Sequence, residues 1–203
     1  MKKPVKPARK NAALPREVRI IGGLWKRTKL AVPELEGLRP TPTRVRETLF
    51  NWLGQDLTGL RCLDVFAGTG ALGLEAASRG ASEVVLVEQE AGLVRALSTV
   101  VTRLKAGGIR VERGDGVSAL RQRNGQGWDL VFLDPPFGED GNTALYQAAL
   151  LAASQAIHAQ GEVYLEAPMV WSDESLASFG LRVHRQDKAG AVAFHLLRPI
   201  AGA

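Results

Sequence analysis

The chain has 203 residues, of which 45% are hydrophobic and 23% charged, a composition typical of a globular protein with one sizeable core. Its apolar runs are shorter than the roughly 18 residues that cross a membrane, so we expect no membrane association. The basic start of the chain is not followed by an apolar stretch, so we expect no secretory signal, and the single cysteine, Cys62, fits a reducing cytoplasm.

Positive charge is concentrated in the first 46 residues. They contain 13 Lys and Arg side chains against 3 Glu, whereas residues 47–203 contain 13 basic and 18 acidic side chains. Residues 1–17 also include three prolines and are expected to form a flexible basic arm. The uneven charge indicates that a polyanion binds at this end, although a solvated tail that only aids solubility is an alternative for the arm.

Residues 18–56 are expected to form a small extension made of a β-hairpin and a helix. The β-prone pieces of residues 18–32 surround a Gly-Gly pair, which suits a turn. Thr41 and Pro42 are typical of the cap and the first position of a helix. Apolar side chains then recur at helical spacing over 45–53, so the helix should bury one face.

From residue 57 to residue 203 the pattern alternates between strands and helices. We expect strands at 61–66, 83–87, 109–113, 129–133 and 163–166, helices at 71–78, 91–105, 117–123 and 143–158, and a closing β pair at 181–186 and 192–197. This alternation predicts an α/β fold, with a mostly parallel sheet of seven strands and helices on both faces. Such sheets bind ligands beyond the carboxyl ends of their strands.

The first strand of this sheet leads into a glycine loop that starts at Asp64. Glycines let a ligand approach the backbone closely, but spaced glycines alone also fit a tight turn or a dinucleotide site. Asp64 favours another ligand, because a carboxylate repels a pyrophosphate and accepts hydrogen bonds from an amino-acid ammonium group. S-adenosylmethionine has that ammonium and no phosphate. In this loop we expect it to contact Asp64, Phe66, Ala67, Gly68 and Gly70.

Two further acidic residues follow the next two strands. Glu88 ends the second strand, where an acidic side chain accepts hydrogen bonds from both ribose hydroxyls. Asp115 follows the third strand, and its carboxylate is expected to receive the adenine amino group while Gly116 lies against the ring. A turn aspartate is the alternative interpretation of Asp115.

The fourth strand ends in Asp134-Pro135-Pro136-Phe137. Two prolines stiffen the chain and make a rigid mount for a reacting group. The side chain of Asp134 and the carbonyl of Pro135 are expected to accept the hydrogens of an exocyclic base amine, and Phe137 to stack on the base, which contributes about 1–3 kcal/mol. The loop therefore predicts direct methyl transfer to an amine, without a metal ion or a covalent enzyme intermediate.

These residues resemble a known family. The glycine loop, Glu88 and the Asp-Pro-Pro-Phe loop look like a Rossmann-like class I methyltransferase of the amino-methylating group. Residues 19–23, 38–41 and 44–53 narrow the resemblance to the bacterial 16S ribosomal RNA guanine-N2 methyltransferases of the RsmD type, over about residues 18–198. The sequence departs from that family at Gly116, where Ala is common, and at Phe194, where Tyr is frequent.

The resemblance implies S-adenosylmethionine as the methyl donor and cytoplasmic action on 16S ribosomal RNA, in the small subunit or in an assembly intermediate. We expect the protein to be a monomer. The resemblance also implies that residues 18–56 contact RNA, with the basic side chains of Lys26, Arg27, Arg39, Arg44 and Arg46 at phosphates or over the site. For any one of these arginines, a charge on the surface or on a helix face is the alternative.

Three other functions stay open at the level of the sequence. The target amine could be adenine N6 in DNA or RNA, the chain could be a dinucleotide oxidoreductase, or it could bind RNA in ribosome assembly without catalysis. His158, His184 and His195 lack the spacing of metal ligands. Glu166 follows the fifth strand and could reach the cleft, but it is not among the predicted site residues.

Overall fold

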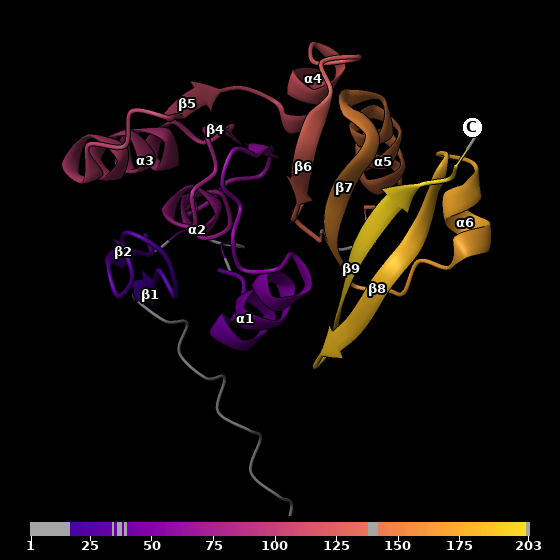
Figure 1. Cartoon of the computed structure of the whole chain (residues 1–203), viewed down its shortest axis with the longest axis horizontal. Coiled ribbons are helices and arrows are strands. Elements are labelled where there is room, and N and C mark those ends of the chain that lie inside the picture. Colours follow the sequence, from indigo (N-terminus) through magenta and orange to yellow (C-terminus); the bar gives the residue numbers. More distant parts are fainter. Residues whose placement is uncertain (1–16, 34, 36–37, 39, 138–141, 202–203) are drawn as a thin grey trace, which may run out of the picture.

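The computed structural model describes residues 17–33, 35, 38, 40–137 and 142–201, so most of the predicted basic arm lies outside the described residues. A two-stranded sheet pairs β1 (Glu17–Arg19) with β2 (Lys29–Ala31) (Figure 1). The larger sheet contains β3 (Arg61–Asp64), β4 (Glu83–Glu88), β5 (Ile109–Arg113), β6 (Trp128–Leu133), β7 (Ile157–Ala167), β8 (Leu181–Ala189) and β9 (Val192–Pro199). The helices are α1 (Thr43–Trp52), α2 (Gly73–Ser78), α3 (Ala91–Leu104), α4 (Gly116–Arg121), α5 (Thr143–Ala156) and α6 (Asp173–Ala177). None of these helices is long and apolar enough to cross a membrane.

The larger sheet has the strand order β5-β4-β3-β6-β7-β9-β8. Its first five strands in this order run parallel, and β9 pairs antiparallel with both β7 and β8. The prediction of a mostly parallel, seven-stranded, Rossmann-like sheet is confirmed. Strand order switches between β3 and β6, which lead into the glycine loop and the Asp-Pro-Pro-Phe loop. Sheets of this type bind ligands at that switch point.

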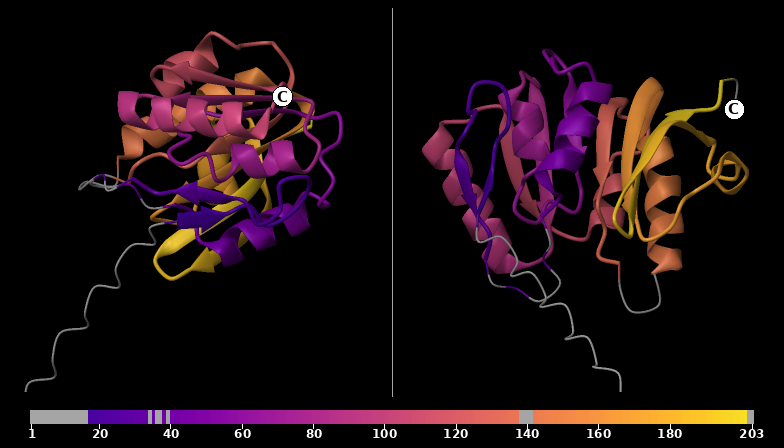
Figure 2. Two further views of the ribbon diagram at one scale, coloured as in Figure 1. Left: turned by 90° about the vertical axis from the view of Figure 1, so that its left-hand side faces the viewer. Right: turned by 90° about the horizontal axis from the view of Figure 1, so that it is seen from below.

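Helices cover both faces of the larger sheet, as the alternation predicted (Figures 1 and 2). Successive side chains of a strand point to opposite faces, so each strand contributes to two cores. Leu63, Val131 and Leu165 belong to the core that includes residues of α4, α5 and α6. Phe132 and Tyr164 belong to the core that includes residues of the hairpin, α1, α2 and α3. The extension therefore shares a core with the rest of the fold.

The predicted hairpin and helix of the extension are both present. Val18 of β1 pairs with Leu30 of β2, and both side chains are buried. Helix α1 starts at Thr43 and Pro42 occupies its N-cap position, so the predictions that Thr41 caps the helix and that Pro42 is its first residue are both wrong by one position. The hydroxyl of Thr41 instead donates to a carboxylate 93 residues away, that of Asp134.

The structure differs from the prediction mainly on the α5–β7 side. The helix expected at 143–158 ends at Ala156, and β7 begins at Ile157 because Ile157 pairs with Trp128 at the start of β6. The closing strands are longer than predicted and reach Ala189 and Pro199. The sequence analysis did not predict the short helix α6, whose five residues are too few to show a helical repeat.

Candidate active site

The glycine loop between β3 and α2 has the backbone that its sequence requires. Gly68 and Gly70 have φ values of +52° and +77°, a region that residues with a Cβ atom rarely adopt. A Cβ atom on Gly70 would also lie 2.6 Å from Cδ2 of Leu97. The loop thus passes close to helix α3, and its shape depends on the absence of side chains at these two positions.

Asp64 is buried beneath this loop, and only one of its two carboxyl oxygens accepts a hydrogen bond from the described residues. Its Oδ2 atom accepts a hydrogen bond from the Gly73 amide at 3.0 Å, while Oδ1 has no hydrogen-bond partner among the described residues. Burial raises the pKa of Asp64 to about 7. A buried acceptor without a partner is costly, so this carboxyl group fits a ligand that brings a donor, such as an ammonium group.

Glu88 joins the end of β4 to the glycine loop. Its Oε2 atom accepts from the Gly68 amide at 2.8 Å, and its Oε1 atom accepts from the Glu90 amide at 2.8 Å. Both oxygens keep acceptor capacity, because a carboxylate oxygen accepts more than one hydrogen bond. The structure therefore places Glu88 beside the glycine loop, and its contact with a ribose stays a prediction.

Asp115 and Gly116 lie at the start of α4, after β5. Oδ1 of Asp115 accepts from the Ser118 amide at 2.8 Å, so the side chain caps the helix, and the residue is exposed. A Cβ atom on Gly116 would lie 2.4 Å from the Val65 carbonyl oxygen and 3.1 Å from the Phe66 ring. Gly116 thus lets α4 approach β3 closely, beside the predicted cofactor contact Phe66.

The Asp-Pro-Pro-Phe loop extends from the end of β6. Asp134 as a whole residue is partly exposed. The pKa of its carboxyl group is nevertheless raised, because the group is shielded from water and lies near the carboxyl groups of Glu166 and Asp64. The Tyr146 hydroxyl of α5 donates to the Pro135 carbonyl at 3.5 Å, a long contact that leaves this acceptor available. The partly buried ring of Phe137 packs against the core next to α5.

Glu166 is a candidate site residue that the sequence analysis set aside. It is 3% exposed, lies at the end of β7, and accepts from the Tyr164 hydroxyl at 2.9 Å. Burial raises the pKa of its carboxyl group. The charge of Glu166 also raises the pKa of Asp134, which follows the neighbouring strand β6. Its position in the sequence could have identified Glu166, because it lies at the carboxyl end of a parallel strand, where such sheets carry their functional side chains.

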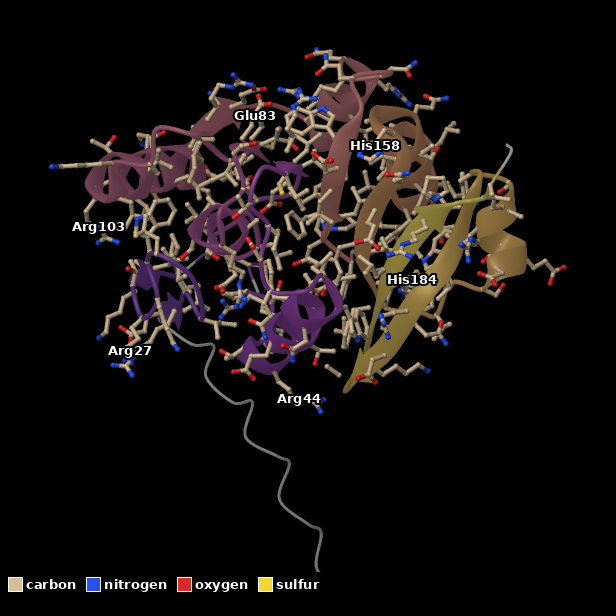
Figure 3. All side chains as sticks on the ribbon, viewed as in Figure 1. Arg27, Arg44, Glu83, Arg103, His158 and His184 are labelled. Carbon is tan, nitrogen blue, oxygen red and sulfur yellow. The ribbon has the colours of Figure 1, made fainter. Side chains whose placement is uncertain are left out.

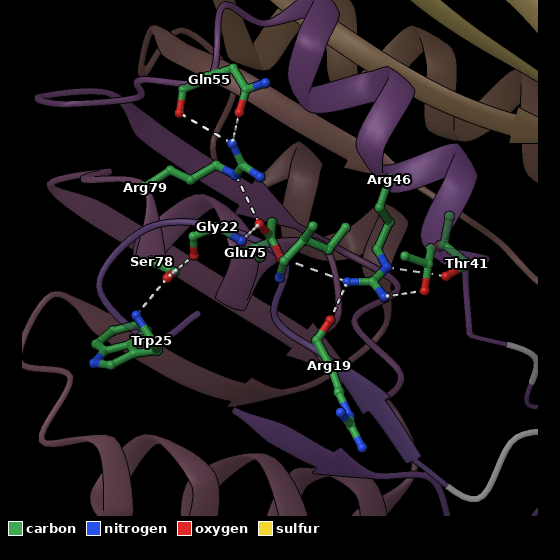
Figure 4. Close-up of polar contacts among 12 residues, drawn as sticks. Arg19, Gly22, Trp25, Thr41, Arg46, Gln55, Glu75, Ser78 and Arg79 are labelled. Atoms are coloured by element: carbon green, nitrogen blue, oxygen red, sulfur yellow. Dashed lines mark hydrogen bonds and ion pairs between the residues drawn. The ribbon is translucent and has the colours of Figure 1, made fainter. Parts of the chain in front are cut away.

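Arg46 is not a surface contact for RNA, so that prediction is wrong. Its side chain is fully buried, its Nη1 atom lies 3.6 Å from Oε2 of Glu75, and it donates to the backbone carbonyls of Arg19 and Thr41 at 2.9 and 3.2 Å (Figure 4). Glu75 also accepts from the Ile21 amide at 2.7 Å. A guanidinium group in such a site holds the hairpin and α1 against α2 and does not reach solvent.

Of the other basic residues predicted to contact RNA, those that the structure describes are exposed, in contrast to Arg46. Lys26 and Arg27 in the hairpin and Arg44 in α1 are exposed. Figure 3 shows the Arg27 and Arg44 side chains extending outward at the same edge of the molecule. Arg39 lies outside the described residues. A hollow of about 430 Å³ lies between the hairpin and the start of α1, with Arg19, Arg27 and Thr41 among its lining residues.

The structure therefore brings most of the predicted site residues to one edge of the sheet, because they follow the carboxyl ends of β3, β4, β5 and β6. Within the described ranges, no three His, Cys, Asp or Glu side chains are arranged to hold a metal ion. Cys62 is fully buried, and burial raises the pKa of its thiol, as in an unreactive core cysteine.

Comparisons with known proteins agree with this arrangement. The family model described as "Conserved hypothetical protein 95" matches residues 18–198. The chain is 42% identical over 184 residues to the "Ribosomal RNA small subunit methyltransferase D" of Escherichia coli strain K12, covering 89% of each protein. It is 41% identical to the protein of the same name from Haemophilus influenzae, covering 74% of this chain and 78% of that one. A solved structure described as "Putative methyltransferase yhhF from Escherichia coli" superposes with a TM-score of 0.76 at 35% identity, covering 91% of this chain and 99% of that chain.

Proposed function

Since the chain belongs to the "Conserved hypothetical protein 95" family and its similar relatives are small-subunit ribosomal RNA methyltransferases, we propose that it methylates the exocyclic N2 of a guanine in 16S ribosomal RNA. The chain is a methyltransferase of ribosomal RNA, as the resemblance implied. The finer parts of the proposal are the donor, the base and the residues that act. The observation that carries them is the position of Asp134 beside the glycine loop at the switch in strand order.

The donor that fits the glycine loop is S-adenosylmethionine, which supplies an electrophilic methyl group when bound. The buried Oδ1 atom of Asp64, which has no partner among the described residues, is matched to its ammonium group. Glu88 at the end of β4 is proposed to accept hydrogen bonds from the ribose hydroxyls of the donor. Asp115 and Gly116 are proposed to bind the adenine, together with Phe66 and the backbone of Ala67, Gly68 and Gly70.

The Asp-Pro-Pro-Phe loop is proposed to orient the target amine. The lone pair of an exocyclic amine is delocalised into the base, so the nitrogen is a poor nucleophile until its hydrogens are bound in a fixed geometry. Asp134 and the Pro135 carbonyl are the acceptors for these two hydrogens, and Phe137 stacks on the base. Holding the nitrogen in line with the methyl group then supplies most of the catalysis.

The extension of residues 18–56 is proposed to bind the RNA. Lys26, Arg27 and Arg44 are exposed cations suited to phosphates. The hollow between the hairpin and α1 supports this proposal, since Thr41 lines it and also contacts Asp134. A route for the nucleic acid therefore leads from the hairpin toward the reacting amine. We propose that the enzyme works as a monomer in the cytoplasm, on 16S RNA in the small subunit or an assembly intermediate.

The test is transfer of a labelled methyl group from S-adenosylmethionine to 16S RNA, small-subunit particles and DNA. We expect label in the RNA or the particles and none in DNA. Asp134→Asn keeps the size of the side chain and removes the charge, and we expect it to lower the transfer rate by about 100-fold or more while donor binding persists. Asp187→Asn, at an exposed position of β8, is the matched control. Full activity of Asp134→Asn would contradict the proposed chemistry.

A further inference from the structure

The carboxyl groups of Asp134 and Glu166 lie side by side at the ends of neighbouring strands. Leu133 of β6 pairs with Leu165 of β7 in parallel register, and the next residue of each strand is one of these two acids. Their side chains leave the sheet on the same face, because Phe132 and Tyr164, two residues earlier, both pack in the core beneath α1.

The hydroxyl of Thr41 lies beside this pair. It donates to Oδ2 of Asp134 at 3.3 Å, so one oxygen of that carboxylate already has a hydrogen-bond donor. Because a hydroxyl group has a single proton to donate, Thr41 cannot also donate to Glu166 while it makes this bond.

The charges around the pair do not compensate two negative charges. Arg46 of α1 is the cation that attracts the charge of Glu166, and it also lies 3.6 Å from the buried carboxylate of Glu75. Arg79 pairs with the same carboxylate at 2.8 Å, so the two guanidinium groups balance Glu75 and only one further negative charge. Asp64 at the end of β3 adds a third buried carboxyl group, which acts on Asp134. Two carboxyl groups this close and this poorly compensated do not ionise together near neutral pH.

Neutral hydroxyl groups complete the surroundings. Tyr164 of β7 donates to Oε1 of Glu166 at 2.9 Å, so Oε2 is the oxygen left to carry a proton. Tyr146 of α5 is fully buried, and this burial, together with the carboxyl groups of Asp134 and Glu166, raises the pKa of its hydroxyl, so it stays neutral. Neither hydroxyl adds a charge to the pair.

We propose that Asp134 and Glu166 share one proton, and that Glu166 holds this proton when Asp134 receives the target amine. Glu166 is thus a positioning residue that acts through Asp134. The consequence for methyl transfer rests on the proposed function, but the shared proton is a property of the free protein.

The proton balance of the reaction follows from this arrangement. The amine nitrogen forms a bond to the methyl carbon as the bond from that carbon to sulfur breaks, which leaves a thioether and a positively charged nitrogen. This nitrogen loses one proton to the carboxylate of Asp134, so the pair becomes neutral with a proton on each member. After the product leaves, the pair returns one proton to water and regains its single negative charge.

The shared proton is tested by infrared spectroscopy of the free protein at pH 9, where Asp64 with its pKa of about 7 is ionised, with ¹³C label in the carboxyl groups of either Asp or Glu. We expect one protonated carboxyl band in the wild type that disappears in both Asp134→Asn and Glu166→Gln, since neither acid alone keeps the proton. A band that persists in either variant, or no band in the wild type, would overturn the proposal. This measurement does not depend on methyl transfer, so it separates the shared proton from the proposed function.

The role of Glu166 is tested by two substitutions of similar size. Gln at position 166 imitates the protonated acid, because its carbonyl accepts from Tyr164 and its amide keeps a neutral donor beside Asp134. Met removes both the acceptor and the donor. In single-turnover transfer we expect Glu166→Gln to stay within about threefold of the wild type and Glu166→Met to fall by tenfold or more, with donor affinity unchanged in both. Equal losses in the two variants would show that the ionised charge is what matters, against the proposal.

The control for these variants is Glu162→Gln, on the same strand. Glu162 pairs with Arg198 at 2.7 Å, four residues before Glu166 and outside the site. We expect it to leave the transfer rate and the infrared band unchanged. Thermal unfolding of each variant checks that folding is retained, so a change in rate is not a change in the amount of folded protein.

Discussion

Asp64 lies at the centre of the cofactor proposal, and its protonation gives that proposal a pH dependence. Burial raises the pKa of this carboxyl group to about 7, so in the free protein it is neutral below that pH and ionised above it. An ammonium group binds to the ionised form. Affinity for a ligand with that ammonium should therefore be highest above pH 7 and should fall as the pH drops through the pKa.

Binding of S-adenosylhomocysteine isolates this contact, because it keeps the ammonium and lacks the sulfonium charge. By calorimetry we expect its Kd to rise about tenfold per pH unit between pH 6.5 and 5 for the wild type. Asp64→Asn should bind more weakly at pH 8 and show a flat profile. An Asp64→Asn variant that keeps the wild-type pH dependence would refute the assignment.

At the residue scale, the sequence identifies those site residues whose roles follow from their position at a strand end. This class contains Asp64, Glu88 and Asp134. The apolar strand before each residue indicates that the residue lies at the carboxyl end of a strand. Thr41 and Arg46 could not be placed in the same way, because their partners are distant in sequence. The Thr41 hydroxyl contacts a residue 93 positions away, and Arg46 is neutralised by Glu75, in another helix.

At the scale of elements, a buried ionic network attaches the extension to α2. Glu75 accepts hydrogen bonds from the amides of Ile21 and Gly22 at 2.7 and 2.8 Å and from Nε of Arg79 at 2.8 Å, while it also faces Arg46. Removing one member of a buried ion pair leaves the other charge uncompensated. The network therefore determines how firmly the hairpin and α1 sit on the fold.

Glu75→Gln should consequently lower the free energy of unfolding by about 3–5 kcal/mol, because it leaves two buried guanidinium groups without a carboxylate. Denaturant unfolding measures this loss. Glu17→Gln, which breaks the exposed ion pairs of Glu17 with Arg19 and Lys29, is the control and should leave stability unchanged. If the two variants were equally stable, the network would not have this structural role.

The ends of helices and strands are predicted well from sequence only where local residues determine them. Strands β3 to β6 and helices α2 to α4 were predicted within a few residues, since each is a single apolar or periodic segment between turn residues. The border between α5 and β7 was misplaced, because the residues around Ile157 have no turn signal and their state is decided by pairing with Trp128. Local sequence carries no information about such a partner.

At the scale of the whole molecule, the exposed cations of the extension should govern RNA affinity. Phosphate contacts release counterions, so the logarithm of Kd should rise linearly with the logarithm of salt concentration. Replacing Lys26, Arg27 and Arg44 together by Gln should weaken binding of 16S RNA and lower that slope by up to about three. Filter binding over a range of salt concentrations measures both quantities.

Arg182→Gln, an exposed change in β8 away from the extension, is the matched control for this surface. It should leave both the affinity and the slope close to the wild type. A triple variant with the wild-type slope, or a control that loses as much as the triple variant, would place the RNA elsewhere on the molecule.

The central claim is that the target is the N2 amine of a guanine in 16S ribosomal RNA. It is tested most directly by treating unmethylated 16S RNA and small-subunit particles with the purified protein and an isotopically labelled donor, then identifying the labelled nucleoside by mass spectrometry. We expect the label in N2-methylguanosine and no labelled product from the Asp134→Asn variant. Label in N6-methyladenosine, or in no nucleoside at all, would contradict it.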